Sequence, residues 1–140
     1  MTWINLDRVA ATHAQKMIKG DKKVLERLLT KALGVLQEQG VYALILFLYS
    51  RTGDEKDAAP HIYRSLFALL KKLPAFKENE ESPRQNSDAN YALKFYANHV
   101  ANDLTTLLLV RELYEQTLIY ARYHAKAVKE KEKGGTGGSS

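Results

Sequence analysis

A glycine directly followed by nine apolar or aromatic residues constrains this chain more than any other feature. The segment 41–49 reads VYALILFLY, and the helical pattern before it ends at Gly40. Glycine can adopt the left-handed conformation that closes a helix. Nine residues are too few to cross a bilayer, which needs about 20, so we expect the segment to be buried in a protein core. Because the rest of the chain offers no strands for pairing, we predict a buried central helix.

The composition predicts one domain that folds without disulfides. The chain has 140 residues, 45% of them hydrophobic, and no cysteine. A chain of this length buries roughly two-thirds of its unfolded surface, and the lack of cysteine excludes thiol catalysis and cysteine zinc sites. The first residues meet an acidic side chain at Asp7 and do not resemble a signal peptide, which leads us to expect a cytoplasmic protein.

Apolar residues at helical spacing predict an all-α, compact single-domain bundle of about six helices. The expected elements are a helix from Asp7 to about Lys19, one from Asp21 to Gly40, the segment 41–49, one from Asp57 to Pro74 with Pro60 in its first turn, and a long pattern from 87 to 129. That last pattern would make a helix of roughly 63 Å, so we expect a break near residues 101–103. Residues 1–133 then form the domain, and the Gly/Ser-rich stretch 134–140 is predicted to be a flexible tail.

The excess of positive charge lies in the first half of the chain. Residues 1–73 hold 12 Lys/Arg and 7 Asp/Glu, whereas residues 74–140 hold nine of each. This asymmetry favours one basic face, with ordinary solubility charge as the alternative. The candidate nucleic-acid-binding residues are Arg8, Lys16 and Lys19 in the first helix, Lys23, Arg27 and Lys31 in the second, and Arg64, Lys71 and Lys72 in the fourth.

Signatures of catalysis and of metal or cofactor binding are weak. The four histidines are widely spaced, and no HExxH, phosphate-binding glycine loop or nucleophile elbow occurs, so we expect no catalytic residues, metal or cofactor. One motif offers an alternative. Arg8 and His13 fit the Arg-x4-His pattern of small helical ribonucleases of the HEPN class, where both residues act on RNA. About 0.6 such matches are expected by chance when three spacings between arginine and histidine are allowed, and Val9 replaces the usual polar residue.

Three segments, taken in order, carry a resemblance to a known family. They are LDRVA at 6–10, the polar–glycine–apolar run LQEQGVYALILFL at 36–48, and the aromatic–basic–alanine ending LIYARYHAKA at 118–127. Together they resemble the Cmr small-subunit family, the small helical subunit of the type III-B CRISPR effector complex, over about residues 6–128. Val41 stands where leucine is common in that family, and Tyr120 where tryptophan is common.

The resemblance implies an all-helical, non-catalytic subunit of a ribonucleoprotein in antiviral defence. Copies of such a subunit stack into a minor filament beside the backbone subunits that hold the guide RNA. Their basic side faces the guide RNA–target RNA duplex, and the filament ends meet the large polymerase-like subunit. The implied partners are therefore these subunits, further copies of the chain and the duplex, with no membrane. The alternatives are a small subunit of the related type III-A complex, a HEPN-like ribonuclease, and a stand-alone helical module that binds nucleic acid or a protein partner.

Overall fold

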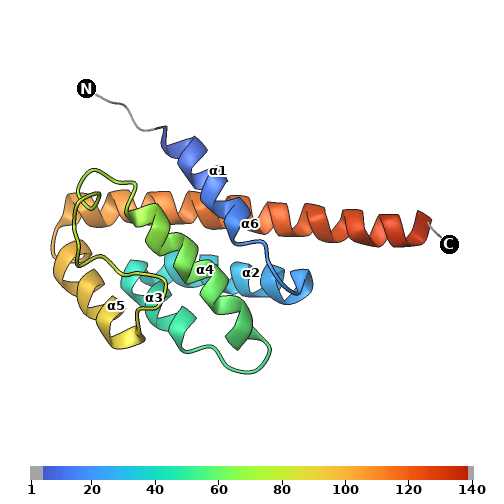
Figure 1. The fold of residues 1–140 in the computed structure, drawn as a ribbon, viewed down its shortest axis with the longest axis horizontal. Coiled ribbons are helices and arrows are strands. Elements are labelled where there is room, and N and C mark those ends of the chain that lie inside the picture. The colour runs from blue at the N-terminus through green and yellow to red at the C-terminus, as the bar shows by residue number, and fades with distance from the viewer. Residues whose placement is uncertain (1–4, 139–140) are drawn as a thin grey trace.

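The computed structural model describes the backbone of residues 5–138 and the side chains of residues 5–128. Within this part of the chain there are six α-helices, one π-helical turn and no strand, so the predicted all-α class is confirmed. The elements are α1 (Leu6–Lys16), α2 (Lys22–Gln39), α3 (Val41–Tyr49), α4 (Glu55–Leu70), α5 (Ala89–Phe95), η1 (Tyr96–Val100) and α6 (Leu104–Gly138). Figure 1 shows the other helices gathered along one part of α6, whose C-terminal part projects beyond them.

The long C-terminal pattern is divided where the sequence predicts a break. Residues 101–103 form a turn between η1 and α6. Asp103 then accepts a hydrogen bond from the backbone N–H of Thr106, at 3.3 Å, in the first turn of α6. The backbone is helical over residues 134–138 as well, where the glycines predict a flexible tail. Residues 139 and 140 lie outside the described residues.

The segment after Gly40 is a helix, as predicted, but it is not buried on all sides. Gly40 has a φ of +99° and closes α2 by donating its N–H to the carbonyl of Leu36 at 3.0 Å. The inner face of α3 packs against α2, α4 and α5, whereas Tyr42 and Leu46 on the other side are 43% and 49% exposed. The prediction that this helix is buried on every side was therefore wrong, because apolar residues do not by themselves show that neighbours cover every face.

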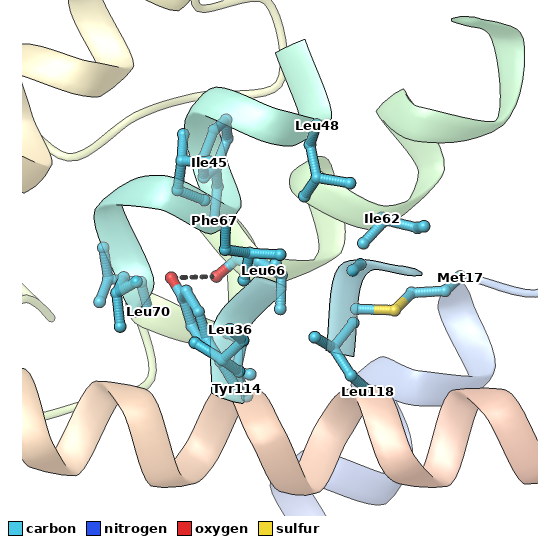
Figure 2. Close-up of a cluster of buried hydrophobic side chains, with 14 of the residues drawn as sticks. Met17, Leu36, Ile45, Leu48, Ile62, Leu66, Phe67, Leu70, Tyr114 and Leu118 are labelled. Atoms are coloured by element: carbon cyan, nitrogen blue, oxygen red, sulfur yellow. Dashed lines mark hydrogen bonds between the residues drawn. The ribbon is translucent and has the colours of Figure 1, made fainter. Parts of the chain in front are cut away.

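The core lies where α1, α2, α3, α4 and α6 meet, as Figure 2 shows. Its largest members include Met17, Leu36, Ile45, Leu48, Ile62, Leu66, Phe67, Leu70, Tyr114 and Leu118. The hydroxyl of Tyr114 donates to the carbonyl of Leu66 at 3.1 Å and also hydrogen-bonds the hydroxyl of Tyr96. Burial raises the pKa of both tyrosines, so both phenols stay neutral. Their hydroxyl groups hydrogen-bond each other, so neither is left without a hydrogen-bond partner inside the core.

Two predicted helix boundaries differ from the structure. α1 is capped by Asn5, whose side chain accepts from the N–H of Arg8 at 3.1 Å, and it ends at Lys16 where Lys19 was expected. Met17, the residue that follows, has a completely buried side chain. α4 begins at Glu55, two residues before the predicted start, so Pro60 lies beyond the first turn. Glu55 is contacted by Arg27 and Lys31 of α2, which lie far away in the sequence, and by the nearby Arg51.

Candidate nucleic-acid interface

Three of the predicted cations meet in one hollow between the end of α1 and the middle of α4. The hollow measures about 280 Å³, and we call it the basic hollow. Its lining residues are Lys16, Lys19, His61, Arg64, Ser65, Ala68 and Gln85. No acidic side chain lines it among the described residues. A concave surface with several cations and no carboxylate concentrates positive potential, which suits a phosphate group.

The local fold explains how residues from distant parts of the sequence reach this hollow. Because α1 ends at Lys16, Lys19 lies in the turn to α2 and not on a helix face. The turn closes at Gly20, whose φ of +76° is in the left-handed region that glycine tolerates best. On α4, the buried side chain of Ile62 turns its neighbours His61 and Arg64 toward the outer surface.

Arg64 is held in place by the loop that follows α4. Its Nε donates to the backbone carbonyl of Gln85 at 3.0 Å. A guanidinium carries five N–H donors, so the two terminal nitrogens remain as donors toward a ligand. The loop therefore orients Arg64 without neutralising its charge.

A further predicted cation, Lys72, is exposed just after the end of α4 and is not among the lining residues of the basic hollow. Lys16 and Lys72 both act on the imidazole of His13, whose pKa is lowered first by burial and then by these two charges, against the hydrogen bond to Val9. His13 Nδ1 lies 2.9 Å from the carbonyl oxygen of Val9, and Nε2 is buried without a hydrogen-bond partner. The ring is only 2% exposed, so it does not reach the surface on which Lys16 and Lys72 lie.

Two predicted cations of α2 are engaged in an ion-pair cluster with the start of α4. Arg27 donates to Asp54 at 2.6 Å and to Glu55 at 3.0 Å, and Lys31 donates to Glu55 at 2.9 Å. Arg51 Nη1 lies 3.5 Å from the second oxygen of Glu55. We call these five residues the ion-pair cluster. The expected row of free charges on α2 is therefore partly neutralised by acids 24 to 28 positions away in the sequence.

The carboxyl groups of the ion-pair cluster have lowered pKa values. Burial acts to raise the pKa of Glu55, but the hydrogen bonds from Lys31 and Arg27 outweigh it, and the pKa falls below its ordinary value. The hydrogen bond from Arg27 also lowers the pKa of Asp54. Both groups are thus ionised at neutral pH and hold the cations to the start of α4.

The remaining predicted cations lie apart from the basic hollow. Lys71 is half-buried, and its Nζ donates to the backbone carbonyl of Asn79 at 2.7 Å, so it fastens the loop after α4. Lys23 is exposed on α2. Arg8 is exposed near the start of α1, about 12 Å along the axis from Lys16. The nine candidates therefore do not form one continuous face.

The residue that the sequence analysis missed is His61. It lies three positions before Arg64 on α4, a spacing that places two side chains on the same side of a helix. That signal was available in the sequence. The proximity of both residues to Lys16 and Lys19 was not, because it depends on how α1 packs against α4.

Metal sites, membrane-spanning helices and relatives among known proteins were also sought. Among the described residues, no group of three or more His, Asp or Glu side chains is placed to hold a metal ion. No helix within that part of the chain combines the length and apolarity needed to span a membrane. Searches of protein-family models, curated proteins and solved structures gave no match. Membership in the Cmr small-subunit family therefore stays a prediction from the three sequence segments.

Proposed function

We propose that this protein is a non-catalytic helical subunit that binds the phosphate backbone of RNA through the basic hollow and Lys72. The observation that carries the proposal is the meeting of Lys16, Lys19, His61 and Arg64 in one concave surface, with no carboxylate among its described lining residues. Backbone phosphates are bound by such clusters without regard to sequence. The three family-like segments suggest the setting, which is a type III-B CRISPR (Cmr) complex in the cytoplasm of a prokaryote.

In that setting the subunit stacks with further copies of itself into a minor filament. It supports the guide RNA–target RNA duplex, while base pairing in the RNA reads the sequence. One hollow contacts few phosphates and binds weakly, and copies arranged along one duplex add their contacts. The backbone subunit and the large polymerase-like subunit are the other proposed partners.

The geometry at Arg8 and His13 does not favour the ribonuclease alternative. His13 is 2% exposed and its Nε2 is enclosed by protein, whereas a general acid or base must come within hydrogen-bond reach of the substrate. We expect purified protein to leave RNA uncut, and His13→Ala to change nothing in that assay. Metal-independent cleavage that disappears in His13→Ala would instead favour the HEPN-like enzyme.

The RNA-binding proposal is tested by reversing charges in the basic hollow. We expect the double variant Lys16→Glu, Lys19→Glu to lose at least about tenfold in affinity for a labelled RNA duplex, since it replaces two phosphate-binding cations by anions. The slope of log affinity against log salt should become shallower by about two. The matched control, Lys94→Glu with Lys126→Glu, changes the net charge equally on exposed residues that do not line the hollow.

Equal losses in the two double variants would show that only net charge matters, and would contradict a site in the hollow. The setting is tested separately by purifying the native protein from its host. Recovery of a short guide RNA together with the backbone and polymerase-like subunits supports the Cmr complex. Recovery of the chain with RNA but without those subunits would favour the stand-alone module.

A further inference from the structure

His61 lies at the boundary between two hollows of opposite charge. On one side is the basic hollow, with Lys16, Lys19 and Arg64. On the other is a hollow of about 290 Å³ lined by Lys19, Gly20, Asp21, Val24, Asp54, Asp57, Ala58 and His61. The turn at Gly20 passes close to the ring, since a Cβ added there would lie 4.0 Å from His61 Nε2. The imidazole therefore lies beside this turn and forms part of the lining of both hollows.

We propose that the basic hollow is a phosphate-binding site in which His61 is the fourth donor and takes up a proton when the phosphate binds. The proposal rests on the RNA-binding function above and adds to it a ligand group and a pH dependence. The other donors are the ammonium groups of Lys16 and Lys19 and the terminal nitrogens of Arg64. Four donors from two sides of a hollow match the oxygens of one phosphate.

The surroundings keep His61 neutral while the site is empty. Its pKa is lowered first by burial, then by the charges of Lys19 and Arg64, with Asp57 acting in the opposite direction. The other ionisable groups lining the two hollows are Lys16 on α1, Asp21 in the turn, and Asp54 at the start of α4, which is paired with Arg27. The neighbouring loop contributes only the neutral Gln85.

A bound phosphate reverses this balance. Its negative charge offsets the cations that disfavour protonation, and the protonated ring gains a charge-assisted hydrogen bond. The pKa of His61 must then rise on binding. By linkage, a group whose pKa rises on binding makes affinity increase as the pH falls toward the pKa of the free protein. The site therefore binds phosphate more tightly in mildly acidic solution, which neither lysine nor arginine can produce.

The first measurement is the pKa of His61 by NMR of isotope-labelled histidine in the full chain. Sulfate is the probe because it is a dianion that does not titrate in this range. We expect a pKa below 6.5 without sulfate and a higher value when sulfate is saturating. The imidazoles of His99 and His124, which do not line the basic hollow, serve as internal references and should shift less.

The second measurement is RNA affinity as a function of pH. The RNA duplex carries 5′-hydroxyl ends, so that no terminal phosphate titrates. We expect affinity to rise about three- to tenfold from pH 8 to pH 6, since one linked proton gives at most about tenfold per pH unit. His61→Gln should lose this rise, whereas the matched variant His124→Gln should keep it.

The outcomes separate this proposal from the RNA-binding function. An unmoved pKa of His61, or a pH dependence that survives in His61→Gln, overturns the role of His61 and leaves RNA binding in place. A raised pKa with sulfate but no RNA binding at any pH supports the phosphate site and overturns the RNA function. An unmoved pKa of His61 together with no RNA binding at any pH overturns both proposals.

Discussion

Two groups of cations that look alike in the sequence have different surroundings in the fold. In the ion-pair cluster, Arg27, Lys31 and Arg51 all contact Glu55, whose side chain is 7% exposed. In the basic hollow, no carboxylate from the described part of the chain lines the surface shared by Lys16, Lys19 and Arg64. The difference shows that a polar helix face predicts exposure but not whether a charge is free. Cations of the first group stabilise the packing of α2 on α4, and those of the second remain for a ligand.

The largest expected effect comes from removing the acid at the centre of the ion-pair cluster. We expect Glu55→Gln to lower the free energy of unfolding by about 2 kcal/mol, because three cations lose their shared carboxylate. Complete removal of a buried partner can cost more, but Arg27 and Lys31 are about half exposed and can be hydrated. Urea unfolding followed by circular dichroism measures the change. Wild-type stability in Glu55→Gln would mean that the cluster contributes nothing to folding.

The same cluster predicts how stability changes in acid. The pKa of Glu55 is lower in the folded protein than its ordinary value of 4.5, so its contribution is complete above that value and is lost as the pH falls through the folded-state pKa. The difference in unfolding free energy between wild type and Glu55→Gln should therefore be largest near pH 7 and shrink below about pH 4.5. Unfolding curves at pH 7, 5 and 3 test this. A difference that stays constant at pH 3 would contradict the ionic origin of the effect.

A smaller effect is expected at Arg51, which joins the cluster to α3. Its Nε donates to the carbonyl of Phe47 at 3.0 Å, and its Cζ lies 3.8 Å from the centroid of the Phe47 ring. We expect Arg51→Ala to destabilise the protein by about 1 kcal/mol through the lost hydrogen bond and cation–π contact. Arg51→Lys should restore only part of this stability. An ammonium lacks the planar group that donates to the Phe47 carbonyl and stacks on the Phe47 ring at the same time. Thermal unfolding of the wild type, Arg51→Ala and Arg51→Lys compares their stabilities. Full rescue by lysine would mean that Arg51 contributes only its positive charge.

The fold class and several helix boundaries could be predicted because they depend on local sequence. Gly40 closes α2 and Asp21 caps it, accepting from the N–H groups of Lys23 and Val24 at 2.9 and 3.2 Å. What could not be predicted depends on contacts between distant segments. The start of α4 at Glu55 and the exposure of Leu46 are of this kind.

The candidate site, like the fold, was predictable only where it depends on local sequence. Residue type and helical spacing identified Lys16, Lys19 and Arg64, and they lie together. The same rules also selected Arg27, Lys31 and Lys71, which contact Glu55 or the loop carbonyl of Asn79. Each of those contacts spans a part of the chain that spacing alone does not bring close. Charge patterning therefore found the cations, and only the tertiary fold separated those that are free to bind a ligand.

The smallest expected effect separates one lysine of each group. Lys19 and Lys31 are both exposed, but Lys19 lines the basic hollow and Lys31 is paired with Glu55. We expect Lys19→Met to weaken RNA binding about threefold and to reduce the salt slope by about one, as one phosphate contact is lost. Lys31→Met should leave RNA binding unchanged and lower stability by less than about 1 kcal/mol, as is usual for an ion pair near the surface. Equal RNA affinities in the two variants would mean that exposure alone decides binding, and the distinction between the hollow and the cluster would then fail.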